Sequence, residues 1–386
     1  MFMKILKKSM PILTALLLFI GCSKEPAVQN PVPDGPGPED ETVTFDFAVS
    51  SLVSTLSAPA SGIDTTKEQA LNNLWVIQYD GDGNNMLSSD YYKTDEIANQ
   101  GTYWTVSVAV QKLDNSKLYF VANVGPEYFV TTAPAATASA FETSTLDFAN
   151  WGSADVKDNG LPMYGSYTGS TMTAPEQQIP LKRMVARVAL KCNVELDSKD
   201  TNTSNGLRPG DKLTLTRVQI MNAATKVQYK PHDDVTNTIY PVNASNADLS
   251  DNYRYYDAED VSVSVDKVWY LPENLKGQNT NITEDSQKGG ANVPAGSTYV
   301  QIDGDYETAQ LDQTGDEAKW VTKIEPVSYC IYLGKDSTTD FNVFRNYSYT
   351  ITVTIKGMDK TDTRVIVDKG VPAGEYVDGE WANSEE

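Results

Sequence analysis

The sequence has very little of the chemistry that most enzymes and metal proteins use. Its 386 residues include one histidine, His232, and three cysteines. A single histidine excludes most catalytic triads with an imidazole base, as well as the zinc-protease motifs that need two histidines. His232 stands in YKPHDD, which is typical of a surface loop. No Cys-x-x-Cys pair, phosphate-binding loop or Gly-x-Ser-x-Gly motif occurs, so we predict no enzyme activity, catalytic residue, metal site or cofactor.

Positive charge is also scarce. The chain has 31 lysines and arginines against 52 acidic residues, a formal net charge of −21. Such a surface repels the phosphates of nucleic acids and anionic lipid headgroups, so we expect neither as a partner. The stretch Asp80–Asn85, DGDGNN, begins like a calcium loop. However, asparagine replaces the glycine expected sixth, and Tyr91 replaces the glutamate expected twelfth. We therefore interpret it as a hairpin turn.

The N-terminus has the features of a secretory leader. Lysines precede the apolar run Ile12–Ile20, which is shorter than the about 20 residues that a spanning helix needs. The run ends in Phe19-Ile20-Gly21-Cys22, which resembles a bacterial lipobox with phenylalanine where leucine is usual. We predict that residues 1–21 are removed as a signal peptide and that the Cys22 thiol is lipidated. The alternative is an ordinary leader in which Cys22 stands by chance.

The first clear strand follows a proline-rich tether at 22–40. In ETVTFDFAVS (41–50) apolar residues recur with a period of two, which predicts a half-buried strand. Its apolar positions are Val43, Phe45, Phe47 and Val49. A loose Ser/Thr/Ala-rich connection comes next, and Lys67 is its first basic residue. We predict a displaceable strand with a candidate protease cleavage site at Lys67, the alternative being a merely solvated lysine.

The rest of the chain shows the alternation of apolar and polar residues that is typical of β-strands. Long strands are predicted within 180–196, 212–221 and 340–357, and short strands at 298–302, 328–333 and 365–367. In 212–221 the alternation slips between Leu215 and Val218, which indicates a β-bulge. Many short strands with frequent turn signals and little helix predict an all-β protein of the β-sandwich class.

The length suits two such sandwiches in tandem. The predicted division is a signal peptide at 1–21, a lipidated tether at 22–40, an N-terminal β-sandwich domain at 41–178 and a C-terminal β-sandwich domain at 179–386. Cys192 lies on the apolar face of its predicted strand, and Cys330 lies on the wetter face of another. Because the faces differ, we expect two free thiols, although export permits a disulfide.

The order of several segments resembles the fimbrillin family, the subunits of the lipoprotein-derived type V pili of Bacteroidales. The resemblance is carried by the leader ending at Cys22 and by TVTFDFAV, LWVIQYDGDG, YFVANVG, LPMYG, PLKRMVARVAL, VWYLPEN and DFNVFRNYSYTITVTIKG. None of these is a sharp motif, but their order extends across nearly the whole mature chain. The resemblance implies two tandem transthyretin-like β-sandwich domains.

The resemblance also implies a function and a route to it. The precursor is expected to be an outer membrane lipoprotein at the cell surface, touching the membrane through its lipid anchor only. A trypsin-like processing protease then removes the first strand. By position the cut falls at Lys67, although the family's best-known cut follows arginine. The C-terminal segment of another fimbrial subunit fills the groove, so the partners are other subunits of a fimbrium with a role in adhesion.

The C-terminal tail departs from this pattern. A donor strand needs long apolar alternation, but Gly370–Glu386 offers four large apolar residues interrupted by a proline and three glycines. The alternatives are therefore a stalk subunit with a weak donor strand, a non-polymerising anchor or tip lipoprotein, and a surface lipoprotein that binds a ligand.

Overall fold

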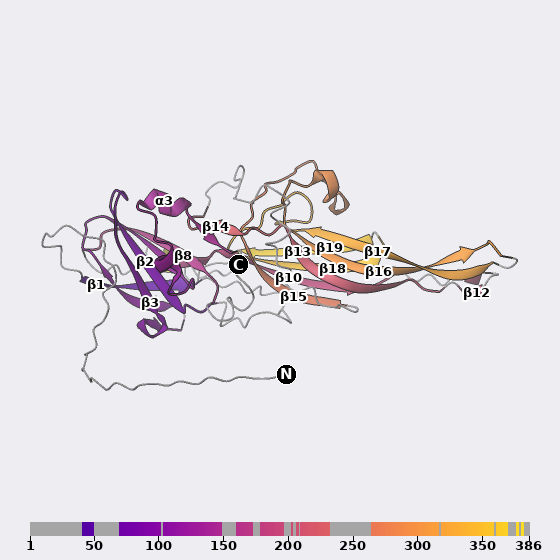
Figure 1. The fold of residues 1–386 in the computed structure, drawn as a ribbon, viewed down its shortest axis with the longest axis horizontal. Helices are drawn as coiled ribbons and strands as arrows, with labels where there is room; N and C mark the ends of the chain where they lie inside the picture. The colour runs from indigo at the N-terminus through magenta and orange to yellow at the C-terminus, as the bar shows by residue number, and fades with distance from the viewer. Residues whose placement is uncertain are drawn as a thin grey trace, which may run out of the picture. The chain divides into compact units, whose positions relative to one another are not determined.

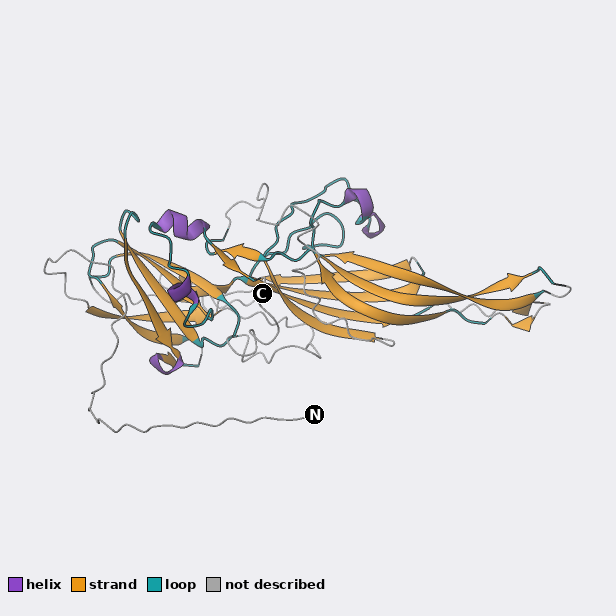
Figure 2. Cartoon of the chain, in the orientation of Figure 1, coloured by secondary structure: helices purple, strands orange, loops and turns teal. Residues whose placement is uncertain are grey.

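In the computed structural model the described residues lie mainly in strands (Figure 2). The described residues are 41–49, 69–101, 103–148, 160–172, 178–196, 202–203, 206–207, 209–231, 264–315, 318–358, 360–369, 376–377 and 380–381. All of them belong to one compact unit, Glu39–Glu386. Within these ranges no helix has both the length and the apolar character needed to cross a membrane.

An eight-stranded sheet forms the first half of the fold, in the order β3-β2-β6-β8-β9-β1-β5-β4. Its strands are β1 (Glu41–Val49), β2 (Asn73–Asp80), β3 (Met86–Lys93), β4 (Ile97–Asn99), β5 (Trp104–Val110), β6 (Ser116–Ala122), β8 (Met163–Gly169) and β9 (Gln178–Arg183). Only two residue pairs join β8 to β9. Buried side chains from β2, β6 and β8 nevertheless form one core cluster with those of β5 and β9, so the sheet folds into two facing layers.

The outer face of β2, β6 and β8 is covered by a second, aromatic core. Two short helices, α2 (Tyr128–Thr131) and α3 (Ala138–Thr143), contribute Phe129 and Phe141 to it. The second half of the chain contributes Tyr229, whose ring stacks on Phe141 with 4.7 Å between centroids. Strands β2 and β6 are therefore buried on both faces, which explains why their sequences are almost continuously apolar.

Two sheets form the second half. One has the order β15-β10-β18-β19 and the other the order β13-β16-β17 (Figure 1). Their facing side chains make a single core cluster. The strands are β10 (Val185–Val194), β13 (Lys212–Met221), β15 (Ser264–Pro272), β16 (Tyr299–Asp312), β17 (Lys319–Tyr332), β18 (Tyr347–Gly357) and β19 (Lys360–Lys369). Two facing antiparallel or mixed sheets with a common core are a β-sandwich.

The remaining elements are small. They are β7 (Thr145–Asp147), which pairs with β14 (Lys226–Gln228), β11 (Asn202–Thr203) with β12 (Gly206–Leu207), β20 (Tyr376–Val377) with β21 (Glu380–Trp381), and the 3₁₀ turns η1 (Thr94–Glu96), η2 (Asp285–Gln287) and η3 (Gly290–Asn292). The β7–β14 pair joins a strand from each half. Only Met184 separates β9 in the first sheet from β10 in the second.

The all-β class is confirmed, and so are two local predictions. The register of β13 against β16 shifts between Leu215 and Arg217, as the slip in the alternation indicated. The stretch Asp80–Asn85 turns β2 into β3, with the Asp80 carboxylate accepting a hydrogen bond from the Asn84 amide at 2.8 Å. The division of the chain at 178 stays a prediction.

Three strands are longer in the structure than the sequence predicts. β16 and β17 pair over fourteen residues each and continue as a two-stranded ribbon past the end of β13 (Figure 1). β19 covers ten residues instead of three. In the β16–β17 ribbon most side chains of β17 are exposed, apolar ones such as Val321 and Ile324 among them, so the period-two signal disappears.

Candidate functional site: the groove held by the first strand

The first strand lies inside the first sheet rather than at its edge. β1 pairs antiparallel with β5 over seven residue pairs, from Glu41 opposite Val110 to Phe47 opposite Trp104. On its other side it pairs parallel with β9 over four residue pairs, from Asp46 with Gln178 to Val49 with Leu181. Because both sides are hydrogen-bonded, β1 completes the layer β9-β1-β5-β4, and its place is a groove between two other strands.

The neighbouring strands make the groove apolar on one face. In β5, Val106, Val108 and Val110 are at most 1% exposed, and in β9 Ile179 and Leu181 are at most 3% exposed. All five belong to the core cluster between the two layers. The residues that alternate with them, including Ser107 and Ala109, are exposed. The groove therefore has one dry and one wet face, as expected for a half-buried strand.

The register puts the predicted apolar positions of β1 over the dry face. Val43 pairs with Val108 and Phe45 with Val106. On the other side Val49 pairs with Leu181. Directly paired residues of neighbouring strands share a face of the sheet, so positions 43, 45, 47 and 49 belong to the face that carries the core cluster. A strand in this groove must therefore be apolar at alternate positions.

The structure does not describe the other predicted site residues. Cys22, Lys67 and His232 lie outside the described residues. Cys192 is buried in β10 and Cys330 is exposed in β17, and both are free thiols. Burial raises the pKa of the Cys192 thiol to about 12. These cysteines therefore belong to the second half of the fold and not to the groove.

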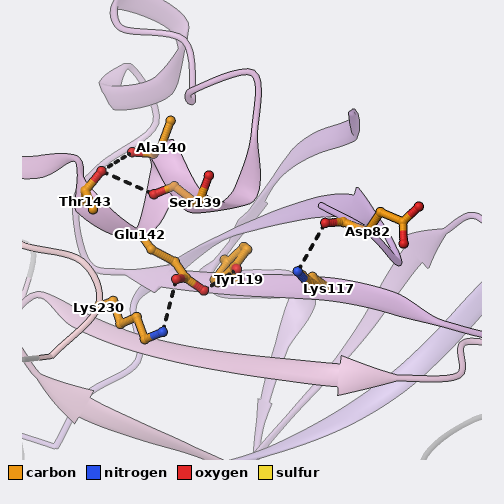
Figure 3. A network of polar contacts seen from close by, with 8 residues as sticks. All are labelled: Asp82, Lys117, Tyr119, Ser139, Ala140, Glu142, Thr143 and Lys230. Atoms are coloured by element: carbon orange, nitrogen blue, oxygen red, sulfur yellow. Dashed lines mark hydrogen bonds and ion pairs between the residues drawn. The ribbon is translucent and has the colours of Figure 1, made fainter. Parts of the chain in front are cut away.

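A polar network near α3 links two parts of the fold (Figure 3). The Glu142 carboxylate accepts a hydrogen bond from the Tyr119 hydroxyl at 2.7 Å and forms an ion pair with Lys230 at 3.1 Å. Burial, followed by the neighbouring Glu142, raises the pKa of Tyr119. The Lys230 amide also donates to the Glu142 carbonyl at 3.2 Å. The network thus fastens α3 and β6 to the chain that follows β14.

The sequence does not reveal that β9 forms one side of the groove that holds β1. The stretch 180–196 alternates with hardly a break, which predicts a single strand. The structure divides it at Met184, and only the part before that residue pairs with β1. The proline at 180 and the charged pair at 182–183 are the signals that could have indicated a change of sheet.

The chain is similar to known fimbrial proteins in sequence. Residues 42–217 match the family described as major fimbrial subunit protein (FimA). Residues 269–353 match a domain of unknown function, DUF4906. The FimA match includes β1, β5 and β9, and therefore the whole groove. No curated protein matches the chain.

Solved structures are similar in fold. Two crystal structures of proposed cell adhesion proteins from Parabacteroides distasonis superpose with TM-scores of 0.50 and 0.51. The first is 18% identical and aligns with 86% of this chain and 100% of its own. The second is 17% identical and aligns with 87% of this chain and 98% of its own. At such identities the likeness concerns the fold alone.

Proposed function

We propose that this chain, whose residues 42–217 match the major fimbrial subunit family, is a fimbrillin, a structural subunit of a cell-surface fimbria that polymerises by exchange of its first strand. The precursor is exported as a lipoprotein anchored through Cys22, and a trypsin-like protease cuts the connection after β1 at Lys67. A strand from another subunit then takes the place of β1. The observation that carries this proposal is the position of β1 between β5 and β9.

Loss of β1 destabilises the first sheet and favours the binding of a replacement strand. It uncovers the apolar row of β5 and β9 and leaves the facing backbone groups of both strands without partners. Burying four apolar side chains at positions 43, 45, 47 and 49 is worth roughly 6–12 kcal/mol, at about 1.5–3 kcal/mol each. Unpaired strand edges are templates for strand addition. A subunit without β1 is therefore unstable until a donor strand binds.

A donor that repeats the pairing of β1 runs antiparallel to β5 and parallel to β9. A donor in the opposite direction would exchange the two kinds of pairing, parallel with β5 and antiparallel with β9. In either direction it must place apolar residues at every second position, because a shift of one residue moves the whole apolar set to the wet face.

The alternative function is a non-polymerising anchor or tip lipoprotein, or a surface lipoprotein that binds a ligand. The sequence of the tail favours it, since Gly370–Glu386 is a poor donor strand. Such a protein would keep its lipid and its first strand. The two functions therefore differ in the N-terminus of the mature protein.

The deciding experiment is N-terminal sequencing and intact-mass measurement of the protein from the native cell surface. A mature chain beginning at Glu68 supports the polymerising subunit, and Lys67→Gln should then leave the chain uncut and unpolymerised. Lys93→Gln, which changes an exposed lysine of β3, is the matched control and should be processed normally. An acylated Cys22 with β1 retained in assembled fimbriae would refute exchange of β1.

A further inference from the structure

The outer face of the sheet β13-β16-β17 carries an open pocket that the fimbrial function does not use. Its volume is about 530 Å³. The lining residues come from all three strands: Thr216, Arg217, Asp303, Gly304, Asp305, Pro326, Val327 and Ser328. Binding sites for small molecules generally measure about 300–1,000 Å³. The pocket is thus large enough for a small ligand.

The β-bulge in β13 builds the pocket. Leu215 pairs with Gly304 and Arg217 with Asp303, so Thr216 is left over between them. Bulges of this kind redirect side chains and often occur beside binding sites. Opposite the bulge, a Cβ atom on Gly304 would lie 2.7 Å from the Thr214 carbonyl oxygen. The strands therefore approach too closely here for any residue with a side chain.

An ion pair forms the polar wall of the pocket. Arg217 donates from Nε at 2.7 Å and from a terminal nitrogen at 2.6 Å to the same Asp303 carboxylate oxygen. The other oxygen of Asp303 accepts from the Gln301 amide at 2.9 Å. The side chains of Arg217 and Asp303 are 43% and 17% exposed. The pair is thus held in place from within the sheet while part of it remains open to a ligand.

The charges and groups of the lining select the class of ligand. A free anion would face two carboxylates, Asp303 and Asp305, and a metal cation would face the Arg217 guanidinium. Hydroxyl groups, which both donate and accept, fit a wall that presents a guanidinium, carboxylates and the hydroxyls of Thr216 and Ser328. The exposed ring of Pro326 offers an apolar surface beside them. We propose that this pocket binds a neutral polyhydroxylated ligand, that is, an uncharged sugar unit.

The test is saturation-transfer difference NMR on the full chain with D-mannose, D-galactose and N-acetyl-D-glucosamine as separate probes at millimolar concentration. We expect transfer to at least one of the three. Thr216→Trp fills the pocket from an exposed position and should abolish the signal. Thr322→Trp, the same change at an exposed position of β17 outside the pocket, is the matched control and should keep it.

Asp303→Asn probes the polar wall itself. Losing a hydrogen bond to a charged group should weaken binding by roughly tenfold or more. Circular dichroism of each variant separates a lost site from a lost fold. The proposal is overturned if none of the three sugars gives a signal, if Thr216→Trp binds as well as the unchanged chain, or if N-acetylneuraminic acid binds as well as the neutral sugars.

Discussion

A buried ion pair between Arg345 and Glu273 should be a main determinant of stability where the two halves of the fold meet. Each side chain is 5% exposed, and they lie 2.9 Å apart. Arg345 also donates to the carbonyl of Gln228 at 2.7 Å and to that of Tyr229 at 2.8 Å. Gln228 belongs to β14, which pairs with β7 of the first half. One guanidinium therefore holds β14 beside the strands of the second sandwich.

Replacing Arg345 by methionine should be costly, because the Glu273 carboxylate then stays buried without a partner. Breaking a buried pair in this way costs about 3–5 kcal/mol. The double variant Arg345→Met/Glu273→Leu removes both charges and should recover part of the loss, since replacing a whole buried pair by apolar residues is often neutral. The recovery is incomplete because the carbonyls of Gln228 and Tyr229 still lose the guanidinium as a donor. The expected coupling free energy in the double-mutant cycle is about 2–3 kcal/mol.

The assay is urea unfolding followed by far-ultraviolet circular dichroism and by tryptophan fluorescence, with the shift in free energy of unfolding taken from both. The matched control is Arg217→Met, which breaks the partly exposed pair with Asp303 and should cost about 0–1 kcal/mol. The reasoning is refuted if Arg345→Met costs no more than this control, or if the double variant loses the sum of the two single losses.

Three further predictions concern titratable groups. At pH 8 a thiol reagent should label Cys330 and leave Cys192 unlabelled until urea is added, because Cys192 is fully buried with a raised pKa; a label found on Cys192 in the folded chain, located by peptide mass mapping, would contradict this. Burial raises the pKa of Asp303, but hydrogen bonds and the ion pair with its guanidinium partner outweigh burial and hold the pKa below its ordinary value. The Asp303 carboxylate therefore stabilises the folded chain above its unfolded pKa of about 3.9, and this stabilisation is lost as the pH falls below that value. In urea unfolding at a series of pH values, the free energy of unfolding of Asp303→Asn should therefore decrease less at acidic pH than that of the unchanged chain. Tyr349→Phe should cost about 1–3 kcal/mol in urea unfolding, because the buried hydroxyl bonds two backbone groups at 2.8 and 3.1 Å; a loss below the error of measurement would argue against those bonds.

Most of the strand content could be predicted from the sequence because half-buried strands reveal their period. The apolar row of β18 and the bulge in β13 are examples, and both follow from which side chains face the core. The full length of β16 and β17 could not be predicted, because most of β17 has no buried face. A ribbon whose strands bury no continuous face leaves no regular hydrophobic pattern in the sequence.

The groove could be predicted only in part. The alternation of 41–49 indicates a strand with one dry face, but no local pattern says which strands it pairs with. The parallel partner β9 lies more than a hundred residues away, and the alternation of apolar and polar residues continues from β9 into β10 with hardly a break. The pocket at the bulge is harder still, because Arg217 and Asp303 meet only through the register of two distant strands. Such constellations depend on pairing, which is a property of the whole fold.

The inner position of β1 has a consequence for how exchange must proceed. Removing an edge strand exposes one edge, but removing β1 exposes β5 and β9 together and detaches the β4–β5 pair from β9. The core cluster beneath them is then exposed to water, and the backbone groups along the edges of β5 and β9 have no hydrogen-bond partners. A chain in that condition is prone to pair wrongly with any extended segment. If β1 is exchanged as we propose, its departure and the arrival of the donor must therefore be coupled, with the incoming strand pairing along β5 or β9 before β1 has fully left.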